Sequence, residues 1–237
     1  MKPHKTIGLH SDNAIKIALK LFDNKQTTEE KIKLLLNNRS ISNLEHVDTP
    51  KDFASGKTID INAGELLGIG IVTAYYDWMS EEDGSGNTYQ AVVGIEDAGK
   101  NQIESQLSDG GVYHDQANKK ILAQQVMTQG YYPEKWITSQ DVIEAVKKKC
   151  AERHKYHEHC ILIVNVFGDK VNVNRKEIYD EISKLPGQFT DTYMVIYGLP
   201  SLSKAHVSSI SEFYIRGLAI ELKRHDYEDI WSFNKVG

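Results

Sequence analysis

Two acidic residues follow two apolar segments that the sequence predicts to be extended. Asp77 comes directly after LLGIGIVTAYY at residues 66–76, and Glu96 comes directly after YQAVVGI at residues 89–95. If these segments pair as neighbouring strands, their ends bring the two carboxylates together. Carboxylate oxygens are ligands that Mg²⁺ prefers, and a bound Mg²⁺ activates water for phosphodiester hydrolysis. The sequence therefore predicts Asp77 and Glu96 as ligands of a catalytic metal ion.

A lysine shortly after Glu96 would complete such a site. Residues two apart along a strand share one face, so a strand that continues past Glu96 would place Ala98 and Lys100 on the same face. On that face Lys100 would polarise the attacking water or the scissile phosphate. We therefore name Asp77, Glu96 and Lys100 as the candidate catalytic residues.

The order of the predicted elements resembles that of the restriction-endonuclease-like fold, the PD-(D/E)XK superfamily. The resemblance covers residues 58–168, which hold the extended meander with Asp77 and Glu96, a helix bearing KKKCAERHKY and the apolar strand CILIVNVF. It implies a Mg²⁺-dependent endonuclease that cuts DNA or RNA, with an acidic residue on one strand and Glu-x-Lys or Asp-x-Lys on the next. Ala98 stands at the lysine position.

Because the motif is incomplete, the chain is also similar to catalytically inactive members of such folds. The alternative function is a non-catalytic scaffold or binding subunit of a bacterial defence or DNA-processing complex. Two further placements of a site stay open. One uses the intact Glu-x-Lys of Glu221 and Lys223, and the other is a small-molecule site near Asp169, at the carboxyl ends of the strands.

A basic helix face is the candidate contact with nucleic acid. Such a face would follow a phosphate backbone, although Glu144 and Glu152 on the same helix partly neutralise it. The predicted contacts are Lys147, Lys148, Arg153 and Lys155.

A cluster of possible zinc ligands overlaps this helix. It consists of Cys150, His154, His157, His159 and Cys160. Cys150 continues the inner face of the helix and Cys160 opens an apolar strand, so the sequence favours two small buried side chains over a zinc site.

Apolar spacing predicts a mixed central sheet flanked by helices, an α/β fold with an N-terminal helical hairpin. Helices are predicted within residues 1–40, near 121–130, over 139–154 and over 174–185. Strands are predicted at 66–76, 89–95, 160–167, 192–199 and 214–222. We expect a single domain over residues 1–237, with a helical extension at 1–40, the α/β core at 58–200 and a strand and tail at 201–237.

Charge and composition limit the possible functions. The 237 residues include 28 Lys and Arg against 33 Asp and Glu, a formal charge of −5, so any contact with nucleic acid must be a local patch. No segment approaches the roughly 18 apolar residues of a membrane span, and the first residues do not resemble a signal peptide. Two cysteines make no disulfide framework. We expect a cytoplasmic protein with nucleic acid, a protein partner or a second copy as its partner, and no membrane.

Overall fold

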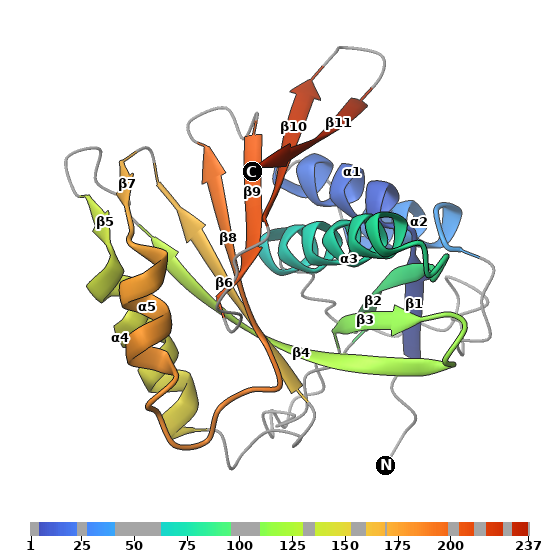
Figure 1. The fold of residues 1–237 in the computed structure, drawn as a ribbon. Coiled ribbons are helices and arrows are strands. Elements are labelled where there is room, and N and C mark those ends of the chain that lie inside the picture. Colours follow the sequence, from blue (N-terminus) through green and yellow to red (C-terminus); the bar gives the residue numbers. More distant parts are fainter. Residues whose placement is uncertain are drawn as a thin grey trace, which may run out of the picture. The chain divides into compact units, whose positions relative to one another are not determined.

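The computed structural model describes ten stretches of the chain. They are residues 5–22, 28–40, 63–95, 110–129, 136–152, 160–168, 170–198, 204–210, 217–224 and 229–236. The chain divides into unit 1, Met1–Ala123, and unit 2, Gln124–Gly237. Strands and helices occur in both units, so the protein is mixed α/β, as predicted (Figure 1).

Unit 1 combines three helices with an antiparallel meander. Its elements are β1 (Lys5–Leu9), α1 (Ser11–Phe22), α2 (Thr28–Asn37), α3 (Ala63–Asp83), β2 (Tyr89–Ile95), β3 (Gly111–His114) and the first residues of β4 (Lys119–Gln129). Strand β2 lies between β1 and β3, and β3 pairs with β4, all antiparallel. The two predicted N-terminal helices correspond to α1 and α2, whereas the spacing of apolar residues gave no sign of β1.

The predicted strand at residues 66–76 is wrong, because this segment forms the first half of the 21-residue helix α3. Every residue from Leu66 to Tyr75 is buried. A helix buried on all sides has no polar face, so its sequence lacks the amphipathic period that distinguishes a helix from a strand. The glycines that suggested a strand allow close packing: a Cβ on Gly70 would lie 3.0 Å from Cγ1 of Ile15 and 3.1 Å from Cβ of Ala14, both on α1.

The helix predicted near residues 121–130 is also wrong, because these residues belong to β4. A turn at residues 115–118 reverses the chain between β3 and β4, and Asn118 has the left-handed φ of 49° that such a turn requires. The apolar residues 121, 122, 126 and 127 matched a helical spacing by coincidence. Pairing with β3 through Val112 and Ile121 determines the extended conformation instead.

Unit 2 is built around a parallel strand pair with antiparallel strands beside it. Its elements are the rest of β4, β5 (Ile137–Thr138), α4 (Ser139–Ala151), β6 (Cys160–Phe167), β7 (Val171–Asn172), α5 (Arg175–Ile182), β8 (Thr192–Gly198), β9 (Lys204–Ser209), β10 (Gly217–Arg224) and β11 (Asp229–Val236). Strand β6 pairs in parallel with β8, and the pairs β8–β9, β9–β10 and β10–β11 are antiparallel.

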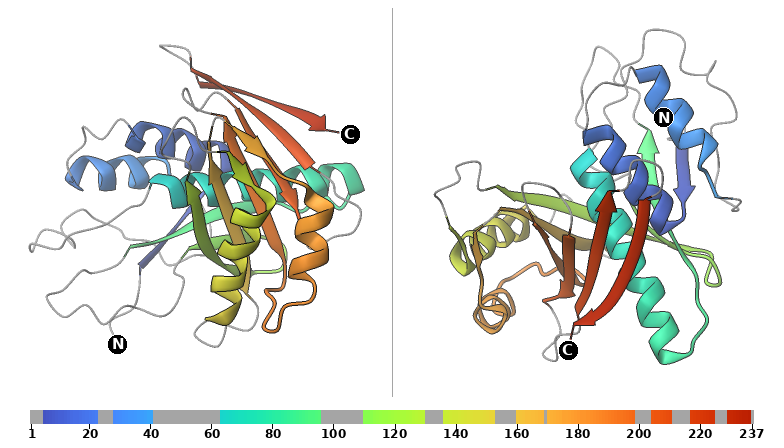
Figure 2. Two further views of the ribbon diagram at one scale, coloured as in Figure 1. Left: turned by 90° about the vertical axis from the view of Figure 1, so that its left-hand side faces the viewer. Right: turned by 90° about the horizontal axis from the view of Figure 1, so that it is seen from above.

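The predictions in this half are largely confirmed. Strand β6 has the predicted bounds, and α4, α5, β8 and β10 lie where the sequence placed two helices and two strands. The backbone N–H of Thr138 donates to Asp141 at the start of α4, and Asn174 accepts from the N–H of Glu177 at the start of α5. Helices α4 and α5 lie side by side (Figures 1 and 2). Strand β11 replaces the predicted tail.

We predict that Gly70→Val destabilises the protein, because the new side chain would collide with α1 at a contact that has no spare room. The expected loss is about 1–3 kcal/mol in the free energy of unfolding, measured by urea denaturation. Glu81→Val is the control, since it places the same side chain at an exposed position of α3. Equal losses in the two variants would contradict the close approach at Gly70.

Candidate functional site

Asp77 lies on helix α3 and connects three elements of unit 1. One carboxylate oxygen, Oδ1, accepts the backbone N–H of Tyr89 on β2 at 3.0 Å. The other, Oδ2, accepts the hydroxyl of Ser11 on α1 at 3.1 Å. Each oxygen of the predicted metal ligand is therefore already bound to a donor of the protein.

Aromatic rings hold the β2 partner of Asp77 in place. The ring of Tyr89 lies 5.1 Å from that of Tyr76, the residue before Asp77, and stacks on His114 of β3 at 4.8 Å between ring centroids. Contacts of this kind stabilise the geometry of packed rings. The donor to Asp77 is thus fixed by packing from α3 on one side and β3 on the other.

Burial raises the pKa of Asp77 from 3.8 to about 6. The hydrogen bonds from Tyr89 and Ser11 lower it, while the nearby charge of Glu81 raises it and that of His10 lowers it. The effect of desolvation on the pKa is larger than that of the two hydrogen bonds. The charged carboxylate is therefore less favourable here than in water, although the group still loses its proton near neutral pH.

The remaining members of the predicted catalytic set, Glu96 and Lys100, lie outside the described residues, so their pairing with Asp77 stays a prediction. Its premise is corrected, since Asp77 lies on a helix and not at the end of a strand. The carboxylate of Asp77 accepts from the N–H of Tyr89, the first residue of β2. At roughly 3.3 Å per residue, the last residue of the strand, Ile95, lies about 20 Å from Tyr89.

The predicted nucleic-acid face is described only in part. Lys147 and Lys148 are exposed on α4, whereas Arg153 and Lys155 lie outside the described residues. The Nζ of Lys147 lies 3.8 Å from a carboxylate oxygen of Glu181 on α5, which also pairs with Lys184 at 2.9 Å. The described surface of α4 and α5 therefore carries interleaved charges of both signs.

The other predicted clusters are likewise incomplete. Cys150 and Cys160 are both buried and form no disulfide with each other, as expected for small core side chains, while the three histidines between them lie outside the described residues. The side chains of Glu221 and Lys223 are not among those described.

A second site in unit 2 has no counterpart among the predicted residues. Arg175, the first residue of α5, places Nη2 3.0 Å from Nδ1 and 3.2 Å from Nε2 of His206 on β9. Burial, with the charge of Arg175 as a smaller cause, lowers the pKa of His206 from 6.5 to about 4. Burial lowers the pKa of Arg175 as well. The pair is therefore a desolvated guanidinium beside a neutral imidazole.

This pair lies near the carboxyl end of β8. His206 is in register with Ile196, two residues before the end of β8 at Gly198, and the parallel strand β6 ends in register with Tyr197. The carboxyl ends of parallel strands, beside the start of the following helix, are where α/β proteins bind ligands. The sequence predicted a small-molecule site at this end of the strands from topology alone, near Asp169. That residue lies outside the described residues. Arg175 and His206 are 31 positions apart and belong to no motif.

Comparisons with family models, with curated proteins and with solved structures found no match. Within the described residues, no helix has both the length and the apolar character needed to span a bilayer. The site is therefore interpreted from its own geometry.

We predict that Asp77→Asn is at least as stable as the wild type at pH 8. The asparagine oxygen can accept from Tyr89 and its amide can donate to the oxygen of Ser11, while the cost of burying a charge disappears. Asp77→Ala loses both hydrogen bonds and should lose about 1–3 kcal/mol in urea denaturation.

The pH dependence follows from the raised pKa. The folded state binds the proton of Asp77 more tightly than the unfolded state, so the contribution of Asp77 to stability is complete below pH 3.8 and is lost as the pH rises through about 6. The stability of the wild type relative to Asp77→Asn should therefore increase as the pH falls from 7 to 4. A flat difference over this range would contradict the desolvation of Asp77.

Proposed function

We propose that this protein is a non-catalytic binding subunit of a larger assembly, built on a nuclease-like arrangement of elements. Three elements on which the nuclease resemblance rests, strand β2, helix α4 and strand β6, follow one another in the predicted order, and they support the proposal, whereas the segment before Asp77 is helix α3 and not a strand. The observation that carries it is the engagement of both oxygens of Asp77 by Ser11 and Tyr89. The acidic position that a nuclease would use for metal serves the folding of unit 1.

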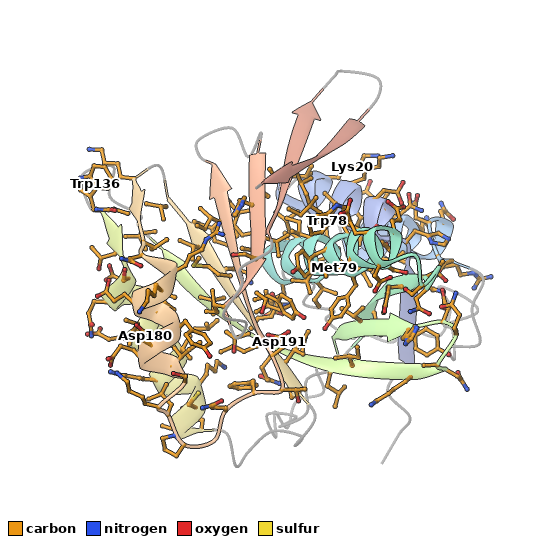
Figure 3. All side chains as sticks on the ribbon, in the orientation of Figure 1. Lys20, Trp78, Met79, Trp136, Asp180 and Asp191 are labelled. Carbon is orange, nitrogen blue, oxygen red and sulfur yellow. The ribbon has the colours of Figure 1, made fainter. Side chains whose placement is uncertain are left out.

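Trp136 is the proposed anchor for the partner. It is 54% exposed and is the only exposed large hydrophobic side chain among the described residues. Figure 3 shows it at the periphery of unit 2, next to β5. Its neighbour Ile137 is buried and donates its N–H to the carbonyl of Lys170, so the backbone next to the tryptophan is held in place. Exposed tryptophans on fixed backbone are frequent energetic centres of protein interfaces.

The proposal predicts a partner that binds through Trp136. Tagged wild-type chain, purified from the cells that produce it, should retain a stoichiometric partner. Trp136→Ala should reduce that retention at least about tenfold, the effect of a loss of 1.4 kcal/mol or more at an interface. Glu144→Ala, at an exposed position of α4, is the control and should retain the partner. A wild-type chain that purifies alone, or a partner held equally by Trp136→Ala, would overturn the proposal.

A Mg²⁺-dependent nuclease is the second candidate, and the pKa of Asp77 favours it. A carboxyl group with a pKa of about 6 lies in the range useful for proton transfer near neutral pH, and such groups are concentrated at functional sites. Wild-type protein incubated with Mg²⁺ or Mn²⁺ should then cleave DNA or RNA, with cleavage lost in Asp77→Asn. Because Asp77→Asn is expected to be as stable as the wild type, loss of cleavage in this variant would show that the carboxylate takes part in the reaction. No cleavage of any substrate by the wild type would remove this candidate.

A further inference from the structure

Arg175 is a partly buried cation without an acidic partner. Its recorded contacts are with the two ring nitrogens of His206, and no carboxylate of the described residues pairs with it. Basic residues near it on α4 and α5 pair with acids, as in Lys176 with Asp180 at 2.7 Å and Lys147 with Glu181 at 3.8 Å. A desolvated guanidinium next to a neutral imidazole is costly unless an anion compensates it.

Ser208 adds an independent sign of a missing partner. Its hydroxyl is fully buried and has no hydrogen-bond partner among the described residues, which is rare because an unsatisfied buried polar group costs about 1–3 kcal/mol. Ser208 and His206 are two apart on β9, so their side chains lie on one face of the strand, the face that Arg175 contacts. In the part of the chain that the structure describes, the hydroxyl without a partner thus lies on the face that the guanidinium without an acid contacts.

The neighbouring strand makes room for the imidazole of His206 on this face. Gly217 of β10 is the register partner of Ser208, and a Cβ on Gly217 would lie 3.1 Å from Cε1 and Nε2 of His206. A residue with a side chain at this position would displace the imidazole. The glycine therefore allows His206 to occupy the space beside Ser208 and to meet Arg175.

We propose that Arg175, His206 and Ser208 form a binding site for a small phosphate-bearing ligand on the face of β9 that Arg175 contacts. The three side chains supply N–H and O–H donors, and a guanidinium matches the oxygens of a phosphate in a bidentate fork. The site lies at the first residue of α5, where the positive end of the helix dipole favours an anion. This inference is independent of the partner proposed at Trp136.

Inorganic phosphate is the probe that tests the site. Isothermal titration of the full-length chain should show saturable binding of phosphate at constant ionic strength, and phosphate should raise the melting temperature. Arg175→Gln should weaken binding at least about tenfold, as expected for the loss of a charge-assisted hydrogen bond. Lys176→Gln removes a neighbouring exposed charge of the same helix and should change binding less than about twofold. Equal phosphate binding by the wild type and Arg175→Gln would overturn the proposal.

Two further measurements keep the test decisive. If Arg175→Gln does not fold, Ser208→Ala replaces it: removing an unsatisfied buried hydroxyl should leave the melting temperature without phosphate equal or higher, while phosphate binding weakens severalfold. Unchanged phosphate binding by Ser208→Ala would count against the site.

Acetate at the same ionic strength separates phosphate from carboxylate recognition, and acetate binding as tight as phosphate binding would overturn the phosphate assignment. Tighter binding of a nucleoside monophosphate than of inorganic phosphate would identify a nucleotide as the source of the phosphate.

Discussion

The parallel pairing of β6 with β8 is the constraint on which the arrangement of unit 2 depends. Two parallel strands cannot be joined by a tight turn, so the chain must return along the sheet through a crossover, here α5. This crossover necessarily begins near the end of β6, and it therefore places Arg175 beside the carboxyl end of β8. Strand β9, which pairs antiparallel with β8, brings His206 to the same end. The site is a consequence of the connectivity.

The polar groups of unit 2 differ between the two ends of β8. Asp191, labelled in Figure 3, lies at its start. Its carboxylate accepts hydrogen bonds from the hydroxyls of Tyr193 and Ser209 at 2.7 and 3.0 Å. In the sheet, the hydroxyl of Tyr197 donates to Asn165, a bond that satisfies two fully buried groups. Near its end, Arg175 has no acidic partner among the described residues. Among the described residues, the side-chain atoms that are buried without a hydrogen-bond partner are Nε2 of His114 on β3 and Oγ of Ser208 on β9, two residues from His206.

The sequence predicted most of the strands and helices whose apolar pattern is unambiguous. Strand β6 is apolar on both faces because it is covered on both sides, and its bounds were predicted correctly. Helix α3 was mistaken for a strand because it is buried without a polar face, so its glycines and β-branched residues outweighed its length in the prediction. The spacing of apolar residues reflects which sides of a segment are buried. It cannot distinguish a helix from a strand where all sides are buried.

The two candidate sites show why chemistry is harder to predict than fold. Asp77 was recognisable as an unusual acid between apolar segments, but its role depends on contacts with Ser11 and Tyr89, which lie 66 and 12 positions away. Arg175 and His206 carry no local signal at all. Only the crossover and the strand order bring them together, so the chemical significance of either residue arises from tertiary structure. The contacts of Asp77 and the contact of Arg175 with His206 therefore follow from the fold of each unit and not from a local motif.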